Sequence, residues 1–255
     1  MNARCNCRIA LPLLFAALLL PAALPAEEKS AAQQAWEAQI GEAQRQNPAF
    51  AFVEDDPALP RVLLIGDSIS IGYTPHVREV LQGVANVHRI PANGGDTNRG
   101  LANIDAWLGE GKWDLIHFNW GLHDLKRVKD GQLDASMERS LTPEAYRENL
   151  QKLTARLQAT GARLIWADTT PVPEGSQGRI PGDELLYNTI AAEVMAALGV
   201  QRNDLHAAIT PYLATHQRPA NVHFLDEGSK RLGETVAKSI AEALRPEGAD
   251  AVAGE

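Results

Sequence analysis

The sequence contains little cysteine and no excess of positive charge. Only Cys5 and Cys7 occur among its 255 residues, which excludes a disulfide-rich scaffold and a zinc site built on cysteines. Lysine and arginine number 24 against 32 aspartates and glutamates, so the net charge is −8. A nucleic-acid-binding protein needs a basic surface for the phosphates, and we therefore expect no nucleic-acid partner.

The sequence also lacks internal repeats, low-complexity tracts and any long hydrophobic run after residue 26. Hydrophobic residues make up 45% and charged residues 22%, which are proportions typical of a folded globular protein. The length is compatible with one or two domains, and a single α/β domain is the simplest arrangement.

The first 26 residues have the pattern of a secretory signal peptide. Arg4 and Arg8 precede an apolar run over residues 9–20, and small residues follow in 21–26. The run is shorter than the roughly 20 apolar residues that span a membrane. We expect cleavage near Ala26, which would remove both cysteines, and a secreted or periplasmic protein without stable membrane insertion. A retained N-terminal anchor is the alternative.

The remaining chain predicts an α/β domain with short extensions. Residues 27–60 are expected to form a helical arm and linker in which Trp36 contacts Ile40, and residues 246–255 a disordered tail. Within 61–245, short apolar runs alternate with helical patterns, which predicts a central parallel sheet with helices on both faces. The expected strands are 62–65, 86–90, 115–119 and 163–167, and the expected helices are 74–81, 99–108, one beginning at Thr142, 183–198, 204–213 and 227–244.

Four polar segments lie beside the ends of these elements, namely Gly66–Ser70, Asn93–Thr97, Trp120–Asp124 and Asn221–Phe224. Three follow expected strands and the fourth precedes the last helix. Parallel sheets carry their sites outside the carboxyl ends of the strands, so we expect all four segments at one edge. A serine after a glycine turn can expose its hydroxyl beside backbone N–H groups, although Gly, Asp and Ser are also common in plain turns.

From about Arg61 to Leu244 the chain resembles the SGNH hydrolases, also called GDSL-type lipases and esterases. The resemblance rests on four ordered blocks, which are Gly66-Asp67-Ser68, Gly95-Asp96-Thr97 with Gly100-Leu101, Gly121-Leu122-His123-Asp124, and Val222-His223-Phe224 with Glu227-Gly228. It implies a flavodoxin-like, three-layer α/β/α fold with a central parallel sheet, which agrees with the alternation of strands and helices.

The resemblance also implies roles for individual residues. Ser68 would be the nucleophile and His223 the general base. The backbone N–H groups of Ser68 and Gly95 would stabilise an oxyanion, with His123 as a third donor and Asn119 as the fallback. His123 could instead be a plain loop residue. No metal and no cofactor is implied.

The sequence departs from the family pattern at two positions. His123 replaces the asparagine of the third block, and Ala220 occupies the position, three residues before His223, where the family usually has the aspartate that orients the base. We expect a backbone carbonyl to orient His223 instead, with the side chain of Asn221 as the second choice and Asp226 as a weaker one.

Together these features predict an exported serine esterase that hydrolyses carboxylic esters, with an acetyl-type acyl group. The expected partner is a small-molecule or carbohydrate ester. A lipid ester or thioester hydrolase and an acyltransferase are alternatives within the same fold. A further alternative is a carbohydrate-binding protein on a catalytically decayed hydrolase scaffold, motivated by His123 and Ala220.

Overall fold

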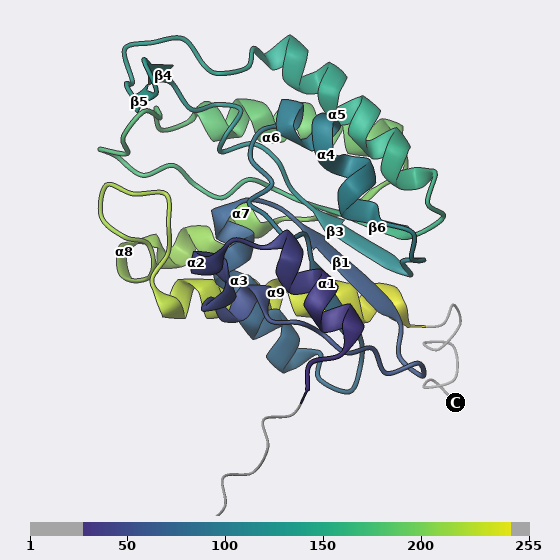
Figure 1. Ribbon diagram of the computed structural model, residues 1–255. Helices are drawn as coiled ribbons and strands as arrows, with labels where there is room; N and C mark the ends of the chain where they lie inside the picture. The colour runs from purple at the N-terminus through teal and green to yellow at the C-terminus, as the bar shows by residue number, and fades with distance from the viewer. Residues whose placement is uncertain (1–27, 246–255) are drawn as a thin grey trace, which may run out of the picture.

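The computed structural model describes residues 28–245 of the chain (Figure 1). The expected signal peptide and the expected C-terminal tail therefore lie outside the described residues. Among the residues that are described, no helix combines the length and apolar character needed to cross a membrane.

The domain is organised around a sheet of five parallel strands in the order β2-β1-β3-β6-β7. The strands are β1 Arg61–Ile65, β2 Asn86–Arg89, β3 Leu115–Phe118, β6 Arg163–Ala167 and β7 Gln201–Asn203. The sequence pattern predicted the first four of these, but β7 was missed. Its three residues are polar and two of them are exposed, so it owes its strand conformation to pairing with β6 and carries no apolar pattern of its own.

Helices cover both faces of the sheet, which confirms the three-layer α/β/α architecture (Figure 1). One layer contains α3 and α9, which pack closely against each other, and the opposite layer contains α4, α5 and α6 in a row. The helices are α3 Ser68–Val80, α4 Thr97–Leu108, α5 Pro143–Gln158, α6 Asp183–Ala197, α7 Leu205–Ile209, α8 Leu213–His216 and α9 Asp226–Leu244. A short 3-10 turn, Thr210–Tyr212, joins α7 to α8.

The core lies on both sides of the central strands. All four residues of β3 are buried, and so are Val62 to Ile65 of β1. Phe118 contacts the rings of Trp120 and Trp166 edge-on, and both tryptophans are fully buried. Burial on both faces is the reason why these strands read as continuous apolar runs in the sequence.

The helix after β1 begins earlier than the sequence predicted. It was expected to start at Thr74 because proline favours the first turn of a helix. In the structure α3 starts at Ser68, and Pro75 lies inside it. Asp67 caps this start, since its Oδ1 accepts the N–H of Ile69 at 2.9 Å. The correction matters for the site because it places Ser68 on the first turn of a helix.

The N-terminal arm is docked on the domain. It comprises α1 Ala31–Gln39, α2 Glu42–Arg45 and the 3-10 turn η1 Pro48–Phe50. The buried side chains of Ile40, Ala49 and Phe50 form a small cluster against which Trp36 and Ile71 pack. Because Ile71 belongs to α3, the arm rests directly on the helix that carries Ser68.

The long loop before α5 is more ordered than a plain polar loop. It contains a two-stranded antiparallel hairpin, β4 Val128–Lys129 with β5 Gln132–Leu133. Arg127 and Arg139, on either side of the hairpin, both form ion pairs with Asp183 at the start of α6. The predicted start of α5 is confirmed, with Thr142 as its N-cap.

Candidate active site

Three loops meet where β1, β2 and β3 end. The first two are held together because the N–H of Gly94 donates to the carbonyl oxygen of Gly66 at 2.9 Å. A Cβ atom at position 94 would lie 2.9 Å from that oxygen, so only glycine allows this approach. The third loop is joined to the second by Asp124, whose Oδ1 accepts the N–H of Thr97 at 2.9 Å and its hydroxyl at 2.6 Å. Burial raises the pKa of Asp124 to about 7.

Ser68 occupies the first position of α3. The first N–H groups of a helix have no acceptor within it, and they lie at the positive end of the helix dipole. The backbone N–H of Ser68 therefore has no acceptor within α3, and it lies beside the half-buried hydroxyl of the same residue. This is the local geometry that can stabilise negative charge next to a nucleophile.

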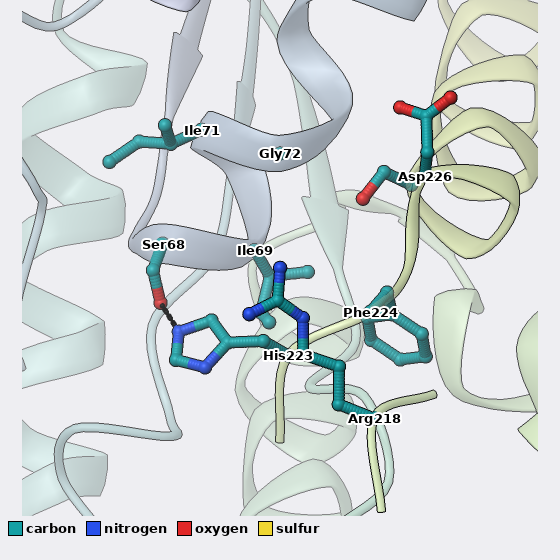
Figure 2. A pocket seen from close by; sticks show the side chains of 9 residues that line it. Ser68, Ile69, Ile71, Gly72, Arg218, His223, Phe224 and Asp226 are labelled. Atoms are coloured by element: carbon teal, nitrogen blue, oxygen red, sulfur yellow. Dashed lines mark hydrogen bonds between the residues drawn. The ribbon is translucent and has the colours of Figure 1, made fainter. Parts of the chain in front are cut away.

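The structure brings Ser68 and His223 into contact although they are 155 residues apart. The Ser68 hydroxyl lies 2.8 Å from Nε2 of His223 (Figure 2). On the other side of the ring, Nδ1 lies 2.7 Å from Oδ1 of Asn221. Asn221 Oδ1 can only accept, so Nδ1 carries the proton and Nε2 is free to accept from the serine hydroxyl. This tautomer is the one a general base needs.

The expectation that a backbone carbonyl orients His223 is wrong, and the second choice, Asn221, fills the role. Asn221 Oδ1 also accepts the backbone N–H of His223 at 2.9 Å. The turn is closed by the N–H of Arg218, which donates to the His223 carbonyl at 2.9 Å. Ala220 adopts the left-handed conformation with φ of 52°. The turn at Ala220 lets the side chain of Asn221 reach the imidazole of His223.

Burial lowers the pKa of His223, and the positive charges of Arg179 and Arg218 lower it further, while Asp67 acts in the opposite direction. Burial likewise lowers the pKa of His123. Both imidazoles are therefore neutral at neutral pH. A neutral His123 has one ring N–H to donate.

The other expected oxyanion donors differ in their availability. The N–H of Gly95 donates to Asn93 Oδ1 within its own loop at 2.9 Å. The side-chain amide of Asn119, the fallback donor, donates to the carbonyl of Ala167 at the end of β6 at 2.7 Å. This amide is therefore already engaged in a hydrogen bond within the protein. Gly95 and His123 line one shared pocket of about 510 Å³, whereas Ser68 and His223 line a different pocket.

Two arginines near the histidines carry no sequence signal that we recognised. Arg179 lies on the loop before α6, where its Nε donates to the carbonyl of Leu122 at 2.8 Å. Arg218 lies at the start of the turn that carries His223. Each occupies a loop without a motif, and only the packing of the loops reveals that it adjoins the site.

A pocket of about 430 Å³ opens directly beside the serine and histidine. It lies between the first turns of α3 and α9, and Figure 2 shows its wall on both sides. Its polar lining residues are Ser68, Arg218, His223, Asp226 and Ser229. The site is therefore open to a small molecule or to the end of a longer one.

Comparison with solved structures finds the same fold in lipases and esterases. A lipase/acylhydrolase from Enterococcus faecalis superimposes with a TM-score of 0.62 and 22% identity, covering 74% of this chain and 98% of that one. An acetylxylan esterase from Geobacillus stearothermophilus gives a TM-score of 0.59 and 17% identity, over 71% of this chain and 94% of that one.

A GDSL-like lipase from Bacteroides thetaiotaomicron gives a TM-score of 0.58 and 13% identity, covering 79% of this chain and 98% of that one. The sequence matches no protein-family model and no curated protein. The chain therefore has the three-layer α/β/α fold of these lipases and esterases, which is the fold that the resemblance to SGNH hydrolases implied.

Proposed function

We propose that the protein is a serine esterase of the SGNH type that hydrolyses carboxylic esters. One observation carries the proposal, namely the continuous hydrogen-bond chain from the Ser68 hydroxyl through the His223 imidazole to Asn221. A serine is a weak nucleophile until an adjacent base takes its proton. The oriented and neutral imidazole of His223 supports that role, and the lipases and esterases that share the fold support the reaction class.

The reaction follows from this geometry. Ser68 Oγ attacks the ester carbonyl carbon while its proton passes to His223 Nε2. The resulting oxyanion is stabilised by the N–H groups of Ser68 and Gly95 and by His123. His223 then gives the proton to the leaving alcohol as the C–O bond breaks. A water molecule gives a proton to His223 and attacks the acyl-enzyme. The bond to Ser68 Oγ then breaks, His223 returns the proton to that oxygen, and the acid is released.

Gly95 can take part only if its N–H changes partner. It donates to Asn93 Oδ1 in the structure, and an oxyanion is a stronger acceptor than a carboxamide oxygen. We propose that the developing charge draws this N–H from Asn93. The left-handed φ of 64° at Gly95 gives the loop a conformation in which a glycine peptide reorients without a steric penalty.

We further propose a small acyl group, such as acetyl, carried on a carbohydrate, and a site of action outside the cytoplasm. The pocket beside Ser68 has several polar lining groups, which suit the hydroxyl groups of a carbohydrate. Two of the structures with this fold are acetyl xylan esterases by name. Export rests on the sequence pattern of residues 1–26.

A fluorophosphonate probe tests the proposed function directly. We expect stoichiometric covalent labelling at Ser68, located by peptide mass spectrometry, because these probes react only with activated serines. The Ser68→Ala variant is the control and should remain unlabelled. An unlabelled wild-type protein that binds glycans would contradict the proposal and favour a decayed, carbohydrate-binding scaffold.

The pH dependence of the activity should reflect the lowered pKa of His223. The base must be neutral to accept the serine proton, and protonation removes activity. Burial and two nearby arginines lower the pKa of His223. As the pH is lowered, kcat/KM should therefore keep its full value at pH 7 and fall only below the ordinary histidine pKa of about 6.5. A pH–rate profile with 4-nitrophenyl acetate measures this. An acid limb centred above pH 7 would contradict the environment described for His223.

A further inference from the structure

The 430 Å³ pocket beside His223 lies on the side from which the leaving alcohol must depart. His223 Nε2 returns its proton to the leaving oxygen, so that oxygen must lie against the imidazole. The rest of the alcohol then extends into the space beside His223, between α3 and α9. Its volume lies near the lower end of the range of small-molecule pockets, about 300–1,000 Å³, which suits a single sugar unit.

Arg218 brings an exposed positive charge to the rim of this pocket. Arg218 lines it together with His223 and Ile69, and Figure 2 shows its side chain alongside the imidazole. The backbone of Arg218 is fixed, since its N–H donates to the His223 carbonyl at 2.9 Å and its carbonyl accepts the N–H of Asn221 at 3.2 Å. Within residues 28–245, its guanidinium forms no ion pair and no hydrogen bond.

The opposite wall of the pocket offers a hydrogen-bond acceptor and a hydroxyl. Asp226 begins α9, and its exposed carboxylate lies 3.4 Å from Nε2 of His76. Ser229 lies one turn further along the same helix. Its hydroxyl comes so close to α3 that a Cβ at Gly72 would lie 3.0 Å from it. A glycine at position 72 therefore keeps this wall open.

We propose that the leaving alcohol is an acidic sugar whose carboxylate pairs with Arg218 and whose hydroxyls bind Asp226 and Ser229. The proposal rests on the proposed esterase function and adds the class of alcohol. A guanidinium presents two parallel N–H groups that match the two oxygens of a carboxylate. Sugar hydroxyls donate well to a carboxylate such as Asp226. The positive end of the pocket lies beside His223 and the negative end across from it, which gives such a sugar one preferred orientation.

Calorimetric binding of glucuronate and of glucose to the wild-type protein tests the proposal without needing catalysis. The two sugars share one ring and differ only in a carboxylate against a hydroxymethyl group. We expect glucuronate to bind at least about tenfold more tightly than glucose, because its carboxylate gains one charge-assisted hydrogen bond from Arg218. Arg218→Gln should abolish this preference, and Arg218→Lys should keep part of it. Arg163→Gln, which removes an exposed arginine at the start of β6, should leave it unchanged.

Equal binding of the two sugars by the wild type, or an unchanged preference in Arg218→Gln, would overturn the proposal. Tighter binding of glucose 6-phosphate than of glucuronate would also overturn it, because the site would then select phosphate. Acetyl release from acetylated glucuronate and acetylated glucose gives the kinetic counterpart, and the ratio of their kcat/KM values should fall in Arg218→Gln. If the fluorophosphonate probe leaves Ser68 unlabelled while glucuronate binding follows the expected pattern, the esterase function fails and the sugar site stands.

Discussion

Replacing Ser68 with alanine should lower kcat for 4-nitrophenyl acetate by at least about 10⁴-fold. The substitution removes the hydroxyl that lies 2.8 Å from His223 Nε2. The general base then has no nucleophile to activate, and only binding and the oxyanion donors remain. The measurement is steady-state kinetics on protein whose folding is checked by thermal denaturation.

The neighbouring Ser70 provides a matched control. Its hydroxyl donates to the Asp67 carbonyl at 2.7 Å and accepts from Arg89 at 3.1 Å, and the side chain is buried. Ser70→Ala should reduce the free energy of unfolding by about 1–3 kcal/mol, yet retain kcat within about tenfold because this hydroxyl cannot reach the imidazole. If Ser68→Ala keeps more than about 1% of the wild-type kcat while the fold is intact, Ser68 is not the nucleophile.

The Ser68 and His223 substitutions should also be strongly non-additive. In the proposed mechanism the two side chains act in one step, so removing the second adds little once the first is gone. The double variant Ser68→Ala/His223→Ala should therefore be about as inactive as either single variant. A double variant that is slower by the product of the two single effects would show that the residues act independently.

The second large effect is expected at Asn221. Asn221→Ala should lower kcat by about 10²-fold, which is smaller than the factor of about 10⁴ found when an orienting aspartate is replaced by a group that selects the wrong tautomer. The side-chain oxygen of Asn221 is the acceptor at 2.7 Å that holds the Nδ1 proton. Without it the imidazole can rotate or change tautomer, while Ser68 and the oxyanion donors stay in place.

Asn221→Asp distinguishes a positioning role from a merely structural one. A carboxylate can accept the same Nδ1–H, so activity should be kept or raised, and its charge should raise the pKa of His223. The acid limb of the pH–rate profile should then move to higher pH. Ala220→Asp is the companion control and should leave the rate unchanged, because Nδ1 is already occupied. A gain in Ala220→Asp together with no loss in Asn221→Ala would contradict the role of Asn221.

The fold was predictable where burial dictates the sequence. Strands β1 and β3 are buried on both faces, so their apolar runs are visible without a structure. Strand β7 was not predictable, since its three polar residues pair only at the edge of the sheet. The start of α3 was predicted six residues too late, because proline favours the first turn of a helix. In the structure Pro75 lies inside α3, which packs against α9.

The residues of the candidate site were likewise predictable only in part. Ser68 and His223 stand in short blocks whose order and position at strand and helix ends are visible in the sequence. Asn221, Arg179 and Arg218 act through loop geometry, which depends on a left-handed residue at 220 and on contacts between segments far apart in the chain. Such contacts leave no periodic pattern, so Arg179 and Arg218 were not predicted, and Asn221 was only the second choice for orienting His223.

The course of α9 has a practical consequence for attaching the protein to a support. Its first turn lines the pocket at Asp226, and its 19 residues end at Leu244. At 1.5 Å per residue the helix extends about 28 Å, so it separates the pocket from Leu244 (Figure 1). A tether, a fluorescent label or a fused module attached at Leu244 would thus lie at the opposite end of α9 from the pocket.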